Sequence, residues 1–147
     1  MKNAQLRANR HVFLLSLLGA SAIVVAQQTL PATMTGTWYA TNVQASSGRY
    51  NPTGGTWSVV IDKQNPDGSI AGKMTWSGSR LCDANNEPIT GRYEGTQLTI
   101  RATLRDKFAN AGCGRVTFVL KKNGTDFEGE IPGSSSGTKV TLKPSAN

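Results

Sequence analysis

The stretch Gln97–Arg105, QLTIRATLR, alternates strictly between apolar and polar side chains. Its four apolar residues are Leu98, Ile100, Ala102 and Leu104, and a threonine or an arginine follows each of them. Successive side chains of a β-strand point to opposite faces, so this period of two predicts a strand with one buried and one solvated face. An amphipathic helix would instead repeat its apolar residues about every 3.6 positions.

The same alternation recurs on both sides of this stretch. The predicted strands comprise residues 36–43, 56–63, 69–77, 89–94, 97–105, 115–122, 125–131 and 138–143. They are eight in number, and no convincing helix stands among them. The sequence therefore predicts an all-β domain.

The connections between these strands are of two kinds. Short connections contain Asp67-Gly68, Gly95 and Asn123-Gly124, which suit tight turns with positive φ. The longer connections span residues 44–55, 78–88, 106–114 and 132–137. Alternate connections of an up-and-down meander lie at the same end, so we expect a tight-turn end and a long-loop end.

Antiparallel strands with one apolar face each must cover both that face and their edges. Closure does both, so the sequence predicts an eight-stranded antiparallel up-and-down β-barrel, with a two-sheet β-sandwich as the alternative. Gly72, Gly91 and Gly129 occur inside predicted strands, where glycine suits the tight bends of barrel corners. The interior of such a barrel is filled by side chains or holds one small ligand.

Cys82 and Cys113 are the only cysteines, and the predicted topology places both at the long-loop end. A bridge between them is therefore geometrically feasible. We expect a disulfide Cys82–Cys113, which would stabilise the fold by roughly 3–4 kcal/mol by restricting the unfolded chain. The alternative, a free catalytic thiol, would lack a histidine to activate it.

The first 26 residues have the parts of a cleavable signal peptide. The basic leader contains Lys2, Arg7 and Arg10. An apolar run over residues 12–25 follows, and small residues lead to Ala26. The run is shorter than the roughly 20 residues that span a bilayer, so we expect no stable membrane anchor. The predicted organisation of this periplasmic or secreted protein is a signal peptide (1–26), a flexible N-terminal arm (27–35), a β-barrel domain (36–144) and a C-terminal tail (145–147).

The charge balance and the lack of histidine exclude several classes of function. The chain has 16 basic and nine acidic residues, and loss of the signal peptide would lower its net charge from +7 to +4. A charge so modest and so dispersed does not indicate nucleic-acid binding. The only histidine, His11, lies in the signal peptide, which excludes histidine-dependent triads and histidine metal sites from the mature chain. We expect no enzyme, no cofactor and no metal.

Gly36-Thr37-Trp38-Tyr39 resembles the Gly-x-Trp-aromatic start of the calycin superfamily, which comprises lipocalin-like and avidin-like barrels. The predicted eight-strand meander is similar to the topology of these barrels. In that superfamily the tryptophan lies in the first strand at the closed end, so the resemblance implies that Trp38 lies at the tight-turn end. It also implies a ligand-binding barrel, but no particular ligand, because the further lipocalin motifs are absent.

Candidate ligand-binding residues gather at the long-loop end. Trp57 begins one predicted strand and Trp76 ends the next, so we expect the two rings to be cross-strand neighbours on the inward face. Beside Arg49 and Arg80 they would form a mouth for a ring-bearing or anionic ligand. The alternative is that both tryptophans simply fill the core.

Acidic side chains suggest two further sites, and both have simpler interpretations. Asp126, Glu128 and Glu130 alternate along one strand, where a carboxylate pair could perform acid and base catalysis. However, the strand 138–143 has two outward lysines, so we expect cross-strand ion pairs instead. The oxygen-rich stretch 83–87 could coordinate calcium, but it lacks the length and the glycine of an EF-hand, so we expect a plain polar loop.

Tyr50 and Phe108 lie in predicted loops, where they would either anchor a protein partner or cap the barrel. The sequence thus supports three functions, in this order. The first is an exported barrel that binds a small hydrophobic or aromatic ligand at its long-loop mouth. The second is a protein-binding barrel, such as an inhibitor of an envelope or extracellular hydrolase. The third is an enzyme that uses carboxylates alone.

Overall fold

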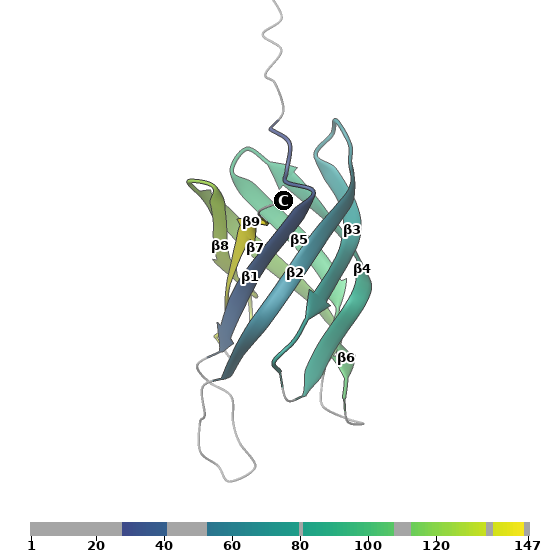
Figure 1. The fold of residues 1–147 in the computed structure, drawn as a ribbon, viewed down its shortest axis with the longest axis vertical. Helices are drawn as coiled ribbons and strands as arrows, with labels where there is room; N and C mark the ends of the chain where they lie inside the picture. Colours follow the sequence, from purple (N-terminus) through teal and green to yellow (C-terminus); the bar gives the residue numbers. More distant parts are fainter. Residues whose placement is uncertain (1–27, 41–52, 80, 108–112, 135–136, 146–147) are drawn as a thin grey trace, which may run out of the picture.

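A computed structural model (Figure 1) describes residues 28–40, 53–79, 81–107, 113–134 and 137–145. The secondary-structure elements within these ranges are all β-strands, as the sequence predicts. No helix in them is long and apolar enough to cross a membrane.

The strands close into a barrel. They are β1 (Thr33–Ala40), β2 (Thr53–Gln64), β3 (Ser69–Trp76), β4 (Cys82–Glu94), β5 (Gln97–Thr103), β6 (Arg105–Asp106), β7 (Arg115–Asn123), β8 (Asp126–Glu130) and β9 (Lys139–Pro144). Successive strands pair antiparallel, β5 pairs with β7, and β9 returns to β1. The short β6 pairs only with the start of β4. The predicted up-and-down barrel is confirmed, and the open sandwich is wrong.

Figure 1 shows the two ends that the sequence predicts. The tight turns β2–β3, β4–β5 and β7–β8 lie at the upper end of this view. The strand ends at Ala40 and Trp76, which lead into the longer connections, lie at the lower end. We call these the tight-turn end and the long-loop end.

The first strand begins at Thr33, although the sequence pattern placed its start at Gly36. Met34 is fully buried and pairs with β2, so it extends the inward-facing row of this strand. The shift places Trp38 near the end of β1, opposite Gly55. Trp38 therefore lies at the long-loop end, and the location implied by the calycin resemblance is wrong.

Residues ahead of β1 are bonded to the tight-turn end. Gln28 Oε1 accepts hydrogen bonds from the Tyr93 hydroxyl (3.1 Å) and from Lys122 Nζ (3.0 Å). Gln64 Oε1 accepts the N–H of Leu30 (2.9 Å), and Gln64 Nε2 donates to the carbonyl of Gln28 (3.2 Å). Leu30 also packs against the core. This part of the arm is thus connected to β2, β4 and β7.

Glycines inside strands allow neighbouring strands to approach closely. A Cβ added at Gly129 would collide with the carbonyl oxygen of Val119 on the neighbouring strand. The same collision with a neighbouring carbonyl would occur at Gly72 and Gly91. The strands come so close at these points that only a residue without a side chain fits.

The inward faces of the strands fill the barrel. The fully buried side chains are Met34, Val59, Met74, Leu98, Ile100, Phe118, Leu120, Phe127, Val140 and Leu142. They come from every strand of the barrel except β4, whose buried side chains Ala84, Ile89 and Tyr93 are 2–3% exposed. The period of two that predicts the strands therefore also predicts which side chains are buried.

Candidate functional site

Trp57 of β2 and Trp76 of β3 are direct cross-strand partners, as predicted. Their ring centroids lie 5.8 Å apart in an edge-to-face arrangement, and the two residues are 2% and 3% exposed. Phe118 of β7 stacks on Trp57 with centroids 4.8 Å apart and lies 5.5 Å from Trp76. Because β7 is on the opposite wall, these rings span the barrel interior.

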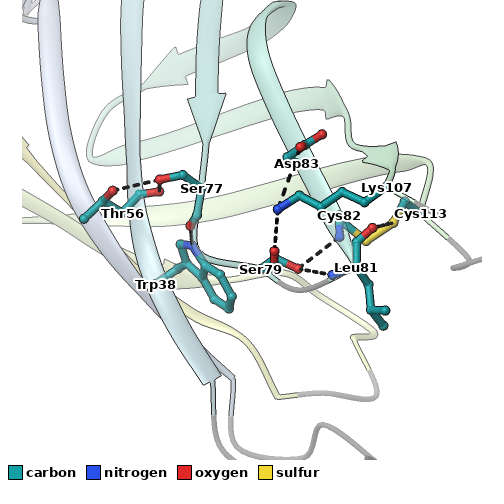
Figure 2. A network of polar contacts seen from close by, with 9 residues as sticks. All are labelled: Trp38, Thr56, Ser77, Ser79, Leu81, Cys82, Asp83, Lys107 and Cys113. Carbon is teal, nitrogen blue, oxygen red and sulfur yellow. Dashed lines mark hydrogen bonds and ion pairs between the residues drawn. A yellow bond between two sulfur atoms is a disulfide. The ribbon is translucent and has the colours of Figure 1, made fainter.

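Trp38 completes this aromatic cluster. Its ring stacks on Trp76 with centroids 4.7 Å apart, and its Nε1 donates to the carbonyl of Ser77 at 2.8 Å (Figure 2). Trp57 Nε1 donates to the carbonyl of Thr141 at 2.7 Å. The N–H groups of these two indoles are therefore satisfied by the barrel's own backbone, as buried polar groups require.

Two hollows lie on the outer wall of the barrel. One, of about 480 Å³, lies over β7, β8 and β9, between the charged side chains of Lys121, Glu128 and Lys139. The other, of about 790 Å³, lies over β9, β1, β2 and β3 and is lined mainly by threonines and serines. The rings of Trp57 and Trp76 contact each other directly, where the sequence analysis expected a ligand.

Four of the predicted binding residues, Arg49, Tyr50, Arg80 and Phe108, lie outside the described residues. Of the predicted ligand-binding set, the structure therefore brings together Trp57 and Trp76.

The predicted disulfide Cys82–Cys113 is present, with its Cα atoms 5.8 Å apart. It joins the start of β4 to the residues just before β7. Hydrogen bonds surround it (Figure 2). Lys107 donates its backbone N–H to the carbonyl of Leu81 (2.9 Å) and its Nζ to the carbonyl of Ser79 (2.7 Å). We call Ser79, Leu81, Cys82, Asp106, Lys107 and Cys113 the disulfide rim.

Carboxylates stabilise the same region. Asp106 Oδ1 accepts the N–H of Cys113 at 2.6 Å. Asp83 lies 3.8 Å from Lys107 Nζ. Cys82, Asp106 and Cys113 lie close enough together to hold a metal ion, but both sulfur atoms are consumed in the disulfide. The rim is thus a covalently fixed structural unit.

Two large apolar side chains are exposed at the long-loop end, and the sequence analysis missed both. Leu81 of the rim is 43% exposed, and Tyr39 of β1 is 49% exposed. The Tyr39 ring lies over Gly54, whose carbonyl in turn lies close to Gly78 in the β3–β4 connection. A leucine directly beside a disulfide cysteine, outside any alternating pattern, was the signal available in the sequence.

The acidic strand β8 has the structural role that the sequence favours. Asp126 forms an ion pair with Lys143 of β9 at 3.3 Å. Glu130 lies opposite Lys139 in the β8–β9 register. These side chains belong to the solvated outer wall, so cross-strand pairing accounts for the alternation of acids.

The stretch 83–87 is part of β4, so the prediction of a polar loop there is wrong. Glu87 pairs with Arg105 of β6, and Asp83 pairs with Lys107. Asp83 pairs with β6, and Ala84 and Glu87 pair with β3, so both neighbours draw this segment into the sheet; a pattern without apolar alternation could not reveal that.

The fold and the site define a closed eight-stranded antiparallel barrel with an aromatic interior and a disulfide rim at its long-loop end, an architecture consistent with calycin-like barrels. No protein-family model, no curated protein and no solved structure matches this chain.

Proposed function

We propose that this protein is an exported protein-binding barrel that contacts a partner protein through its long-loop end. The observation that supports this proposal is that the aromatic rings pack against one another inside the barrel, while the large apolar side chains of Tyr39 and Leu81 are exposed at the long-loop end. An envelope or extracellular hydrolase is the partner class that fits a small barrel of this kind.

The packing of the interior argues against a small ligand there. Trp38, Trp57, Trp76 and Phe118 are each at most 5% exposed and stack on one another. A ligand would have to displace these ring contacts, each of which contributes about 0.5–1.5 kcal/mol beyond its buried area. The outer surface is the more favourable place for binding.

The chemistry of the rim supports a protein interface. Leu81 is an exposed apolar side chain next to the charged Lys107 and Asp83. An apolar centre within a polar surround is the usual arrangement of protein interfaces. The disulfide and the hydrogen bonds of Lys107 hold this segment in place, which lowers the entropy cost of binding.

The test compares two exposed apolar residues. The full-length protein is expressed in its own source and isolated with any bound partner, as wild type, as Leu81→Asp and as Val60→Asp. Val60 is the matched control because it is 39% exposed but lies on the outer wall of β2. We expect Leu81→Asp to reduce the recovered partner at least tenfold and Val60→Asp to leave it unchanged, with equal melting temperatures.

Equal recovery with both variants would contradict the proposal. Native mass spectrometry of the same samples tests the alternative function, in which the barrel binds a small ligand. A small molecule that is bound to the wild type and lost on Trp76→Phe would also overturn the proposal and assign the function to the interior.

A further inference from the structure

At the long-loop end, strand β7 extends beyond its pairing with β8. It pairs with β5 along its length, from Thr103↔Arg115 to Gln97↔Lys121. On its other side it pairs with β8 only from Val119 onward. Residues 115–118 therefore have a strand partner on one side only within the part of the chain that the structure describes. We call them the β7 edge.

The polar groups of the β7 edge can be assigned to a side. The carbonyl of Val119 points toward β8, because its oxygen meets the position of a Cβ on Gly129. Backbone groups alternate sides along a strand, so the N–H and C=O of Thr117 and Arg115 point the same way. Among the described residues no backbone group of the β8 side bonds to them.

A local turn leaves this edge open. Ile131 to Ser134 form a turn that is closed by the bond from the Ser134 N–H to the Ile131 carbonyl (3.2 Å). Pro132 occupies its second position and Gly133 its third, with φ of 72°, which is the signature of a type II turn. Pro132 also has no N–H to continue a ladder with β7. The chain therefore turns back to β9, and no described segment pairs with the β7 edge on this side.

The outer face at this edge is cationic. Arg101 lies opposite Thr117 and Arg115 lies opposite Thr103, so the two arginines are diagonal neighbours on the same face. Both are exposed, and neither forms an ion pair with a described residue. By contrast, Arg105 on the same wall is paired with Glu87.

We propose that the β7 edge binds an extended acidic segment of the partner protein by β-strand addition. The N–H and C=O groups of Thr117 and Arg115 form main-chain hydrogen bonds to the segment, and Arg101 and Arg115 pair with carboxylates at its alternate positions. This inference rests on the proposed function, because it names the partner element that the long-loop end receives.

The β7 edge is continuous with the disulfide rim. Cys113 of the rim lies two residues before Arg115, and the bond from the Leu104 N–H to the Gly114 carbonyl (2.8 Å) fixes the residue between them. A partner that covers Leu81 is therefore in a position to extend a strand along β7.

The test uses a peptide probe with blocked ends and alternating valine and glutamate residues. Its binding to the full mature protein is measured by calorimetry and by the NMR shifts of the Arg115 and Thr117 amides. Thr117→Pro removes the N–H that points to the open side, while Val116 and Phe118 keep the bonds to β5. We expect it to weaken binding about tenfold or more, and Thr117→Val, which keeps the N–H, to bind as the wild type does.

Two further measurements keep the test decisive if Thr117→Pro fails to fold. A probe N-methylated at alternate amides cannot form the strand ladder, and we expect its binding to be lost. Arg115→Glu should weaken binding at least tenfold, whereas Lys73→Glu, the same charge change on an exposed β3 residue, should not. Probe binding that is indifferent to N-methylation or to Arg115→Glu would overturn the inference, as would an edge occupied by a second copy of this chain.

The inference and the proposed function can fail separately. If Leu81→Asp loses the partner but Thr117→Pro retains it, the rim binds a protein and the strand addition is wrong. If the probe binds the β7 edge but partner recovery ignores Leu81→Asp, the strand addition stands and the proposed function falls.

Discussion

The two ends of the barrel are built in different ways. At the tight-turn end, short turns join neighbouring strands, and residues near the start of the described chain bond to Tyr93, Lys122 and Gln64. At the long-loop end, an aromatic cluster and one disulfide join segments that are distant in the sequence. Short turns shape the first end and hydrogen bonds from residues ahead of β1 add to it, whereas the second end is joined by a covalent bond and stacked rings.

The difference bears on where function resides. Long connections tolerate changes in length and composition without disrupting the strands, because they are not restricted to one turn geometry. Long connections that bind a partner need rigid support. At the long-loop end this support comes from the stacked rings of four aromatic residues and from the disulfide. The exposed Leu81 and the β7 edge both belong to this end of the barrel.

The largest effect is expected at the centre of the aromatic cluster. Trp76 contacts Trp38, Trp57 and Phe118, so Trp76→Ala removes three ring contacts and leaves a cavity. We expect the free energy of unfolding to fall by about 3–5 kcal/mol in urea titrations followed by circular dichroism. Tyr39→Ala, at an exposed ring, serves as the control and should change it by less than about 0.5 kcal/mol. A loss as small as that of the control would mean that the cluster does not support the long-loop end.

The next effect separates the two ends directly. Replacing Cys82 and Cys113 by serine should lower the free energy of unfolding by about 2–4 kcal/mol, because the unfolded chain loses its cross-link. Hydrogen exchange of the folded variant should accelerate at the Lys107 and Cys113 amides, whose partners lie in the rim. The Gly68 amide, bonded within its own turn, should exchange as in the wild type. Uniform acceleration at both ends would contradict their independence.

The smallest effect concerns the tight-turn end. Asp67 Oδ1 accepts the N–H (2.9 Å) and the hydroxyl (2.6 Å) of Ser69, and these bonds lower the pKa of Asp67 below its ordinary value of 3.8. A pKa that is lower in the folded state stabilises the fold above the unfolded value, and this stabilisation is lost as the pH falls through the folded value.

We therefore expect Asp67→Asn to lower the melting temperature slightly at pH 7. The difference from the wild type should shrink as the pH falls below about 3.8. Ser69→Ala removes the hydroxyl donor and should reduce the same pH dependence in part. Thermal unfolding between pH 7 and pH 2 measures it, and a difference that is constant across this range would exclude Asp67 as the source.

Prediction from the sequence succeeded where the signal was local. The alternation of Leu98, Ile100 and Ala102 identified both a strand and its buried face. It failed at Met34, which stands among polar residues and is drawn into β1 by pairing with β2. It failed again at the start of β4, where the stretch 83–87 enters the sheet because it pairs with β6 and with β3.

The candidate site was predictable in part for the same reason. The Trp57–Trp76 pair followed from strand register, and the disulfide followed from the ends at which the cysteines fall. The open edge of β7 had no such signal, because it depends on which of the described segments lie nearby in three dimensions.

The residue pattern alone was sufficient for the all-β class and the buried faces, because side-chain alternation and turn chemistry act over a few neighbouring residues. It also favoured a closed meander over a sandwich and predicted the cysteine pair. Only the folded barrel decided that the rings of Trp38, Trp57, Trp76 and Phe118 pack together. It also decided that the start of β7 extends beyond the end of β8. Those outcomes depend on the curvature and the relative lengths of strands that meet across the barrel, and no local stretch of sequence contains that information.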